Sequence, residues 1–164
     1  MAVKHTTLKY IRVLEELDFL QGYVSLIANS SSNEFNVELY LNDGLDPDTL
    51  LIPPMLIHHC VDLQIENRFS KHFSNGSLEL HFYKIDDETV GCDIVDQNPE
   101  AHAFKEKHLK TGQKETLALL DEVRKDIFNN YEGEYNIEVD YIHSPNGEPM
   151  GTKTILSFPL LLDH

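Results

Sequence analysis

The 164-residue sequence has no tryptophan, only two cysteines and few basic side chains. Cys60 and Cys92 are too few for the disulfide framework that stabilises small secreted domains, so we interpret them as buried thiols in a reducing compartment. Thirteen Lys and Arg against 28 Asp and Glu give a formal net charge of −15. The phosphates of nucleic acids and anionic membrane surfaces repel a chain of this charge, so neither is an expected partner.

Signals for membranes and metals are missing as well. The sequence has no run of about 18 apolar residues, the length that crosses a bilayer. Polar residues closely follow Met1, so no signal peptide is indicated. None of the nine histidines stands in a ligand spacing such as His-Glu-x-x-His. We therefore expect a cytoplasmic chain of one domain, with no membrane insertion and no metal site.

Residues 50–70 carry the clearest local pattern. Pro53 and Pro54 suit the first turn of a helix, where a missing N–H costs nothing and a fixed φ is already helical. The apolar residues that follow recur at helical spacing: Leu56, Ile57, Cys60, Val61 and Ile65. The stretch predicts a helix over 53–70 with one buried face.

A second helical pattern covers residues 7–28. A seam of apolar residues alternates spacings of three and four: Tyr10, Val13, Leu17, Leu20, Val24 and Ile27. Further apolar residues widen the surface beyond this seam: Leu14, Phe19, Tyr23 and Leu26. Monomeric proteins rarely expose so wide an apolar surface. We therefore expect the helix over 7–28 to form the interface of a homodimer or to bind a kinase partner.

Five further segments alternate apolar and polar residues, as strands do, and turn residues separate them. They are residues 35–41, 78–85, 89–96, 134–143 and 152–160. Residues 97–112 have no clear period and are expected to form a long loop or lid, before a helix over 113–130. The predicted fold class is an α/β (α+β) sandwich, a mixed and mostly antiparallel sheet with the helices over 53–70 and 113–130 on the same face.

Several segments, taken in order, resemble one protein family. Residues 46–62, which include IPPMLIHHCVD, resemble the start of the ATP-binding helix in LytS-like sensor histidine kinases, which have the GHKL (Bergerat) ATPase fold. Residues 14–26, LEELDFLQGYVSL, resemble the family's second dimerisation helix. Residues 146–160, NGEPMGTKTILSFPL, resemble its closing hairpin. Asp96 stands where the family's aspartate contacts the adenine amino group.

The resemblance implies a histidine-kinase-type ATPase-like domain over 31–164. Residues 1–30 would then be an N-terminal helix that remains from the dimerisation hairpin. The resemblance also implies the positions of a vestigial nucleotide pocket: Asp62, Asp96, Asn98, Gly151 and Thr152. It assigns no catalytic residue, because the phosphoacceptor motif of the kinases is absent.

The residues that would hold Mg²⁺ and the phosphates are largely replaced. The family motif Val-Glu-Asn reads Val61-Asp62-Leu63 here, and Leu63 offers no oxygen to a hard cation. The glycine box that begins at Asp96 continues as Gln97-Asn98-Pro99-Glu100, without glycines and with a carboxylate near the expected phosphates. The second box retains only Gly112. Neither ATP nor Mg²⁺ is therefore an expected cofactor.

Three functions are open at this point. The favoured one is a degenerate histidine-kinase ATP-binding domain, a pseudo-enzyme that acts in signal transduction through protein contacts, with nucleotide binding weak or lost. The first alternative is a functional ATP-binding catalytic domain of a two-component sensor histidine kinase. The second is a binding module for a small purine or an anion. Magnesium-dependent affinity for ATP separates the first alternative from the other two.

Three smaller features have a chemical and a structural interpretation, and we favour the structural one for each. His58, His59 and Cys60 would suit a metal or a thiol nucleophile, but neighbouring helix positions point about 100° apart, which favours helix packing. Asp62 and Glu66 form a carboxylate pair, which we interpret as a solvated face. The basic residues of the long loop would attract an anion or form a solvated loop: His102, Lys105, Lys107, His108, Lys110 and Lys114.

Overall fold

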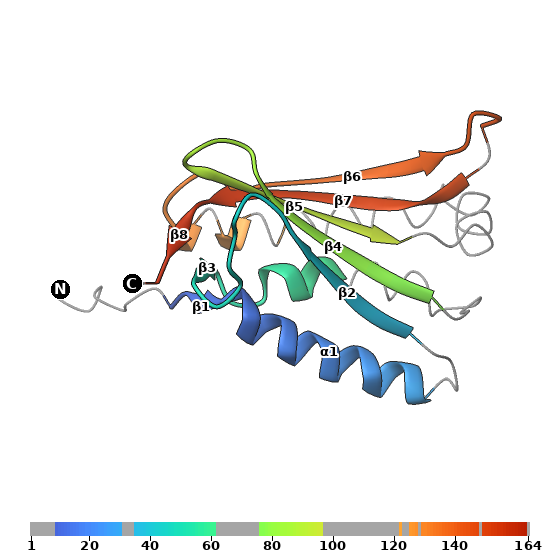
Figure 1. Ribbon diagram of the computed structural model, residues 1–164, viewed down its shortest axis with the longest axis horizontal. Helices are drawn as coiled ribbons and strands as arrows, with labels where there is room; N and C mark the ends of the chain where they lie inside the picture. Colours follow the sequence, from blue (N-terminus) through green and yellow to red (C-terminus); the bar gives the residue numbers. More distant parts are fainter. Residues whose placement is uncertain are drawn as a thin grey trace.

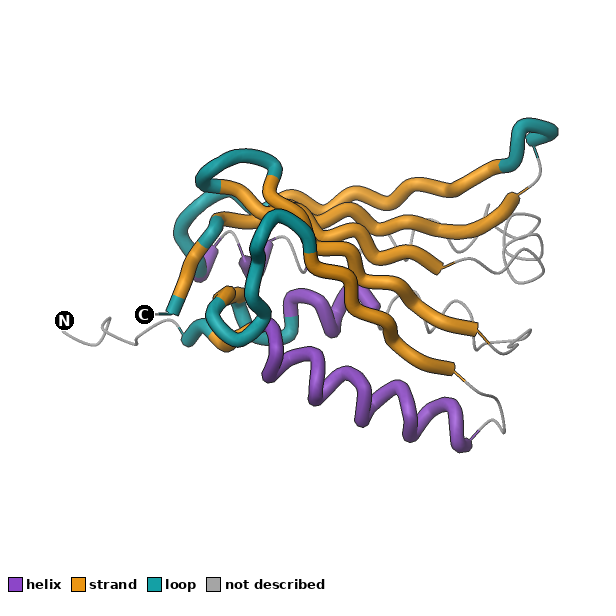
Figure 2. Tube along the Cα trace, viewed as in Figure 1, coloured by secondary structure: helices purple, strands orange, loops and turns teal. Residues whose placement is uncertain are grey.

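The computed structural model describes residues 9–30, 35–61, 76–96, 122, 125–127, 129–147 and 149–163. The chain forms a twisted sheet with helices beneath one of its faces (Figure 1; Figure 2). The elements are β1 (Ile11–Arg12), α1 (Val13–Ser30), β2 (Phe35–Leu41), β3 (Leu50–Ile52), β4 (Gly76–Lys84), β5 (Thr89–Asp96), β6 (Asn136–His143), β7 (Pro149–Pro159) and β8 (Leu161–Leu162). Helical residues also occur over 56–61 and at the described positions between 122 and 130.

The main sheet has five strands in the order β2-β4-β5-β7-β6. β2 runs parallel to β4, and all other neighbouring strands are antiparallel. These are the five strands that the alternating pattern predicts, with bounds that differ by at most three residues. α1 and the helix over 56–61 lie on the same side of this sheet (Figure 1). The predicted fold class, a mixed and mostly antiparallel α/β sheet, is confirmed.

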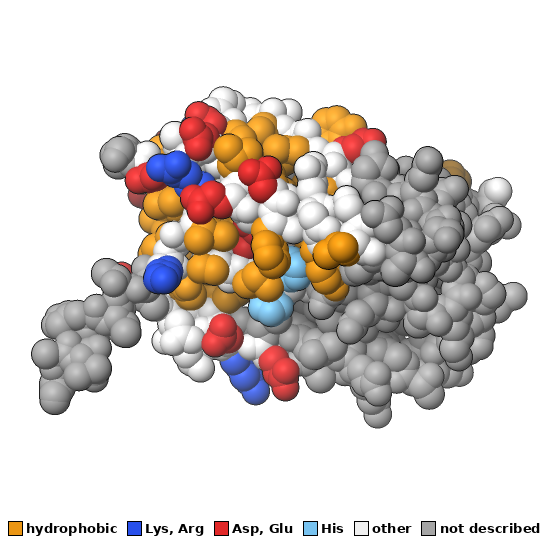
Figure 3. All heavy atoms as spheres, turned by 90° about the horizontal axis from the view of Figure 1, so that it is seen from below, with side chains coloured by type: hydrophobic (Ala, Val, Ile, Leu, Met, Phe, Trp, Pro, Cys, Tyr) orange, Lys and Arg blue, Asp and Glu red, His pale blue; other side chains and the backbone are white. Residues whose placement is uncertain are grey.

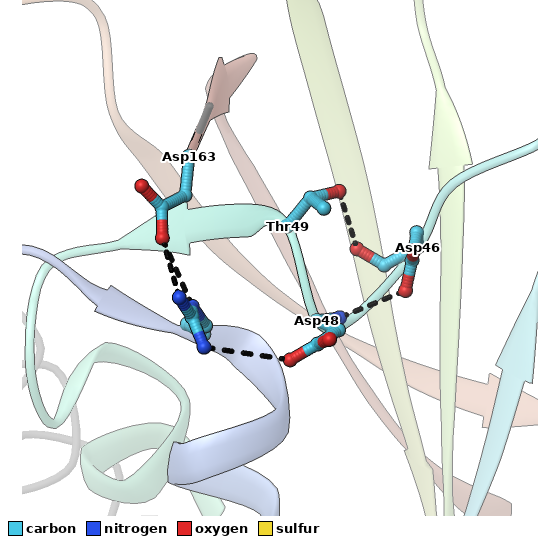
Figure 4. Close-up of polar contacts among 5 residues, drawn as sticks. Asp46, Asp48, Thr49 and Asp163 are labelled. Atoms are coloured by element: carbon cyan, nitrogen blue, oxygen red, sulfur yellow. Dashed lines mark hydrogen bonds and ion pairs between the residues drawn. The ribbon is translucent and has the colours of Figure 1, made fainter.

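A second, small sheet was not predicted. It has the order β1-β3-β8 and joins the start of α1, the lead-in to the helix over 56–61 and the end of the chain. Arg12 closes this corner, because its guanidinium donates to a carboxylate oxygen of Asp163 at 2.8 Å and lies 3.6 Å from a carboxylate oxygen of Asp48 (Figure 4). The predicted helix over 7–28 is therefore corrected at its start: residues 11 and 12 form a strand, and the helix begins at Val13.

The seam on α1 belongs to the core of its own domain. Val13, Leu17, Leu20 and Val24 are at most 5% exposed and lie in one cluster with buried residues of the main sheet. The seam therefore packs within its own domain, and any interface on α1 would rest on the apolar residues outside the seam. The apolar residues outside the seam behave differently, since Phe19 is 61% exposed.

The helix over 56–61 begins later than the two prolines predict. Met55 lies between them and the helix with φ at 71°, so the regular helix starts at Leu56. A positive φ is uncommon for a residue with a Cβ and marks a locally constrained backbone. The predicted buried face is confirmed as far as Val61. The rest of the predicted helix, residues 62–70, lies outside the described residues.

Candidate functional site

Three of the five predicted pocket positions meet at one end of the main sheet. Asp96, the last residue of β5, pairs with Leu78 of β4 and with Thr152 of β7. Gly151 adjoins Thr152 on β7 and pairs with Ile142 of β6. The strand register therefore brings Asp96, Gly151 and Thr152 together. Asp62 and Asn98 lie outside the described residues, as do Glu66 and the basic residues of the long loop.

Asp96 lies on the helix-covered face of the sheet. It follows the buried positions Cys92 and Ile94 at a spacing of two, and its side chain is only 2% exposed. Thr154, on the adjacent strand, is 2% exposed as well. A buried carboxylate and a buried hydroxyl on neighbouring strands offer hydrogen-bond acceptors and one donor within an otherwise apolar layer.

A second buried carboxylate joins α1 to the helix over 56–61. Glu16 is 2% exposed, and its carboxylate accepts hydrogen bonds from the backbone N–H groups of Met55 and, at 2.7 Å, of Ile57. Burial raises the pKa of Glu16 to about 7, although the hydrogen bonds from Ile57, Met55 and His58 oppose this shift. The sequence interpretation did not find this residue. The available signal was an acidic residue on the core side of α1, between Val13 and Leu20.

One turn further along α1, two aromatic residues also contact the helix over 56–61, through the ring of His58. The His58 ring lies 5.4 Å from the ring of Phe19 and 4.6 Å from that of Tyr23, measured between centroids. His58 is only 7% exposed, whereas His59 faces solvent. The two neighbouring imidazoles therefore have different surroundings, as expected for helix packing.

The structure also bears on the proposed chemistry of Cys60. The thiol is buried, and burial raises its pKa to about 12. A thiol with so high a pKa stays protonated near neutral pH and is a poor nucleophile. Within the described ranges, no group of three or more His, Cys, Asp or Glu side chains is placed to hold a metal ion. No helix in the same ranges is long and apolar enough to span a membrane.

The chain is similar to solved structures of histidine kinases. No family model matches the chain, and no curated protein matches it. Among solved structures, the mycobacterial sensor histidine kinase MprB is similar with a TM-score of 0.57 and 16% identity, over 94% of this chain and 99% of that chain. The catalytic domain of the histidine kinase ThkA is similar with a TM-score of 0.55 and 14% identity, over 93% of this chain and 96% of that chain.

Longer kinase structures match in part. Full-length ShkA in complex with AMPPNP is similar with a TM-score of 0.60 and 15% identity, over 96% of this chain but only 32% of that chain. ThkA in complex with the response regulator protein TrrA is similar with a TM-score of 0.55 and 12% identity, over 93% of this chain and 41% of that chain. The chain therefore has the fold of histidine kinase catalytic (ATPase) domains.

Proposed function

We propose that this chain is a degenerate, LytS-like histidine-kinase ATP-binding domain. It is a pseudo-enzyme that acts in bacterial two-component signal transduction through protein contacts, in the cytoplasm, with nucleotide binding weak or lost. One observation carries the proposal: Leu63 stands where the kinases that the chain resembles have their Mg²⁺-ligating asparagine. This substitution occurs in a chain whose sheet and core keep the kinase fold.

In the proposed pocket, the residue expected to contact adenine is retained, whereas the residues expected to hold Mg²⁺ and the phosphates are replaced. On the adenine side, Asp96 is present, buried and paired with Thr152. On the phosphate side, Leu63 supplies no ligand to Mg²⁺, and Glu100 adds a negative charge that repels phosphates. A pocket of this composition loses the phosphate and metal interactions of ATP but keeps groups that can recognise a purine.

The proposed partner surface is the outer side of α1. Leu14, Phe19 and Leu26 are 38%, 61% and 72% exposed. Viewed from below, exposed hydrophobic side chains gather beside histidine on this part of the molecule (Figure 3). We propose that this side forms a homodimer or binds a kinase partner. ThkA, whose catalytic domain has a similar fold, has been solved in complex with the response regulator protein TrrA.

The alternative functions predict different ligands. A functional kinase catalytic domain would bind ATP in a Mg²⁺-dependent manner. A purine module would bind adenosine without Mg²⁺, through Asp96. The retained Asp96–Thr152 pairing is compatible with either ligand, so binding measurements must decide between them.

The deciding experiment compares melting temperatures with and without millimolar Mg-ATP, and with adenosine alone. A ligand at 100 times its dissociation constant adds about 2.7 kcal/mol to the free energy of unfolding, which corresponds to several degrees. We expect no shift with Mg-ATP, while ShkA, which has been solved in complex with AMPPNP and is measured in parallel, serves as the positive control. A reproducible, Mg²⁺-dependent rise would refute the pseudo-enzyme. A rise with adenosine that Asp96→Asn abolishes would favour the purine module.

A single substitution tests how far the pocket has diverged. Leu63→Asn restores the side-chain oxygen at the metal position but leaves Gln97 to Glu100 unchanged. We therefore expect no Mg-ATP binding by this variant. Measurable binding would show that Leu63 alone blocks the site.

A further inference from the structure

We propose that the side of β2 that faces away from β4 is a docking site for an extended, basic segment of a partner protein, which adds to the main sheet as a further strand. This surface differs from the outer side of α1, and the proposal does not depend on whether nucleotide binds. It rests on the strand order of the main sheet and on the charges beside β2.

The main sheet has two edge strands, β2 and β6. β2 pairs with β4 over its whole length, and no strand in the described part of the chain pairs with its other side. An edge strand presents backbone N–H and C=O groups along its outer side, and these groups can hydrogen-bond with a strand from another molecule. The strand order therefore makes β2 a position for strand addition.

The two edge strands are protected to different degrees. β6 carries Glu138 and Asp140, and its register with β7 is irregular between Ile142 and His143. Charged side chains and bulges are features that discourage pairing at a sheet edge. β2 has a single charged residue, Glu38, and an unbroken register with β4. Of the two edges, β2 is therefore the more suitable for an added strand.

Side chains on both faces of β2 are accessible. Leu39, on the face toward the helices, is 36% exposed, and Tyr40, on the opposite face, is 42% exposed. α1 lies beneath β2 on the helix-covered side (Figure 2). Because side chains alternate between the two faces of a strand, an added strand would carry apolar residues on the side of Leu39 and polar residues on the side of Tyr40.

Two carboxylates lie side by side on the open face, which is the face of the main sheet away from α1. Glu38 of β2 is in register with Glu79 of β4. The Tyr40 hydroxyl donates to Glu38 at 2.8 Å, and Nε2 of His81 lies 2.9 Å from a carboxylate oxygen of Glu79. The rings of Tyr40 and His81 stack, with centroids 4.6 Å apart. Like charges at paired positions repel one another, so a cationic side chain beside them is attracted to both.

Charge also decides which kind of segment fits. On the open face, Lys153 pairs with Asp93 at 3.0 Å. The chain as a whole has a net charge of −15, so a basic segment complements it. A second copy of the chain is disfavoured: if two β2 strands pair antiparallel over 35–41, Glu38 at the centre lies opposite the Glu38 of the second copy. The occupant that these charges favour is therefore a basic segment with alternating apolar residues.

The test uses the intact chain and a fluorescein-labelled peptide in which lysine and valine alternate over about seven residues, the length of β2. Fluorescence anisotropy at about 0.15 M salt should give a dissociation constant below about 100 μM. The same peptide with every backbone amide N-methylated keeps its charges and side chains but cannot donate backbone hydrogen bonds, so we expect no detectable binding. The proposal is overturned if the first peptide does not bind, or if the N-methylated peptide binds equally well.

Two charge reversals locate the contact. Glu38→Lys and Glu138→Lys make the same change on the open face of the two edge strands. Glu38→Lys should weaken peptide binding about tenfold, because attraction to the lysines becomes repulsion, whereas Glu138→Lys should change it less than about twofold. Glu38→Lys also removes the repulsion with Glu79, so it should fold. Equal weakening by both variants would mean that the peptide responds to the acidic chain as a whole, which contradicts docking at β2.

Hydrogen exchange measured by NMR shows where the peptide lies. At a peptide concentration about ten times its dissociation constant, the amides of β2 that point away from β4 should exchange about tenfold more slowly. The amides of β6 should exchange at unchanged rates. Protection of β6 without protection of β2, or of neither strand, overturns the proposal even if the peptide binds.

Discussion

Both faces of α1 carry apolar side chains, but these side chains have different surroundings. On the inner face, Val13, Leu20 and Val24 are at most 1% exposed and belong to the core. On the outer face, Phe19 and Leu26 are 61% and 72% exposed. Helical periodicity finds both rows of side chains, because both recur at multiples of the helical repeat. It does not determine which row faces the sheet; the rotation of the helix about its own axis decides that.

Tertiary contacts at the N-terminal end of α1 fix the rotation of the helix about its axis. The Leu14 N–H donates to the Pro47 carbonyl at 2.9 Å, and Arg12 pairs with Asp163. Glu16 points inward to the backbone of Met55 and Ile57. None of these partners lies near α1 in the sequence. The inner face therefore contributes to the stability of the domain, and the outer face is exposed.

The largest expected effect comes from truncating the inner face. Leu20→Ala removes a fully buried side chain, and such substitutions reduce the free energy of unfolding by about 3–4 kcal/mol through lost transfer energy and a residual cavity. Leu26→Ala, the same change on the outer face, should alter it by less than about 0.5 kcal/mol. Urea denaturation measures both. If both variants lose the same free energy of unfolding, the two faces of α1 do not differ in their contribution to stability.

A smaller effect concerns the one acidic residue on the inner face. The pKa of Glu16 rises from its ordinary value of 4.5 to about 7 on folding, so the folded state binds the extra proton between these pH values. The contribution of this group to stability is therefore fully present below pH 4.5 and is lost as the pH rises through 7. The whole change amounts to roughly 3 kcal/mol.

Urea midpoints at pH 5 and pH 8 test this sign. Because other groups titrate as well, the relevant quantity is the difference between the wild type and Glu16→Gln, which should lose this part of the pH dependence. Glu15→Gln on the exposed side of α1 is the matched control. A pH dependence identical in all three proteins would show that Glu16 has the same pKa in the folded and unfolded states.

The fold was largely predictable from the sequence, and the site only in part. The period-two pattern located all five strands of the main sheet, because each has one buried face. The small sheet escaped notice, because β1 and β8 are each two residues long and too short to show a period. The resemblance predicts Asp96 and Thr152 as pocket positions, and the strand register adds that the two residues are paired across β5 and β7.

Glu16 shows why some site residues cannot be found this way. Its partners are the N–H groups of Met55 and Ile57, about forty residues along the chain, and no local pattern encodes such a pairing. An acidic residue in an apolar seam usually indicates a break in the seam. Here it marks a buried carboxylate that accepts hydrogen bonds from backbone N–H groups of a distant segment, which only the three-dimensional structure reveals.

The smallest effect on stability, and the clearest effect on assembly, is expected on the outer face. Phe19→Ser with Leu26→Ser removes most of the exposed apolar surface of α1 while leaving the core unchanged, so the double variant should lose less than about 1 kcal/mol of stability. If α1 forms a homodimer, light scattering at tens of micromolar protein should give a dimer for the wild type and a monomer for the double variant. Ile85→Ser, an apolar residue that is 52% exposed elsewhere, should remain dimeric.

The salt dependence of dimer formation provides a further test of the interface. Two copies that each carry a net charge of −15 repel one another, so added salt should strengthen a dimer that apolar side chains hold together. Each large apolar side chain buried at the interface contributes roughly 1.5–3 kcal/mol before the entropy of association is subtracted. A wild-type protein that stays monomeric at high salt would exclude self-association through α1 and leave a kinase as the proposed partner of this face. A double variant that remains dimeric would place the interface on another surface.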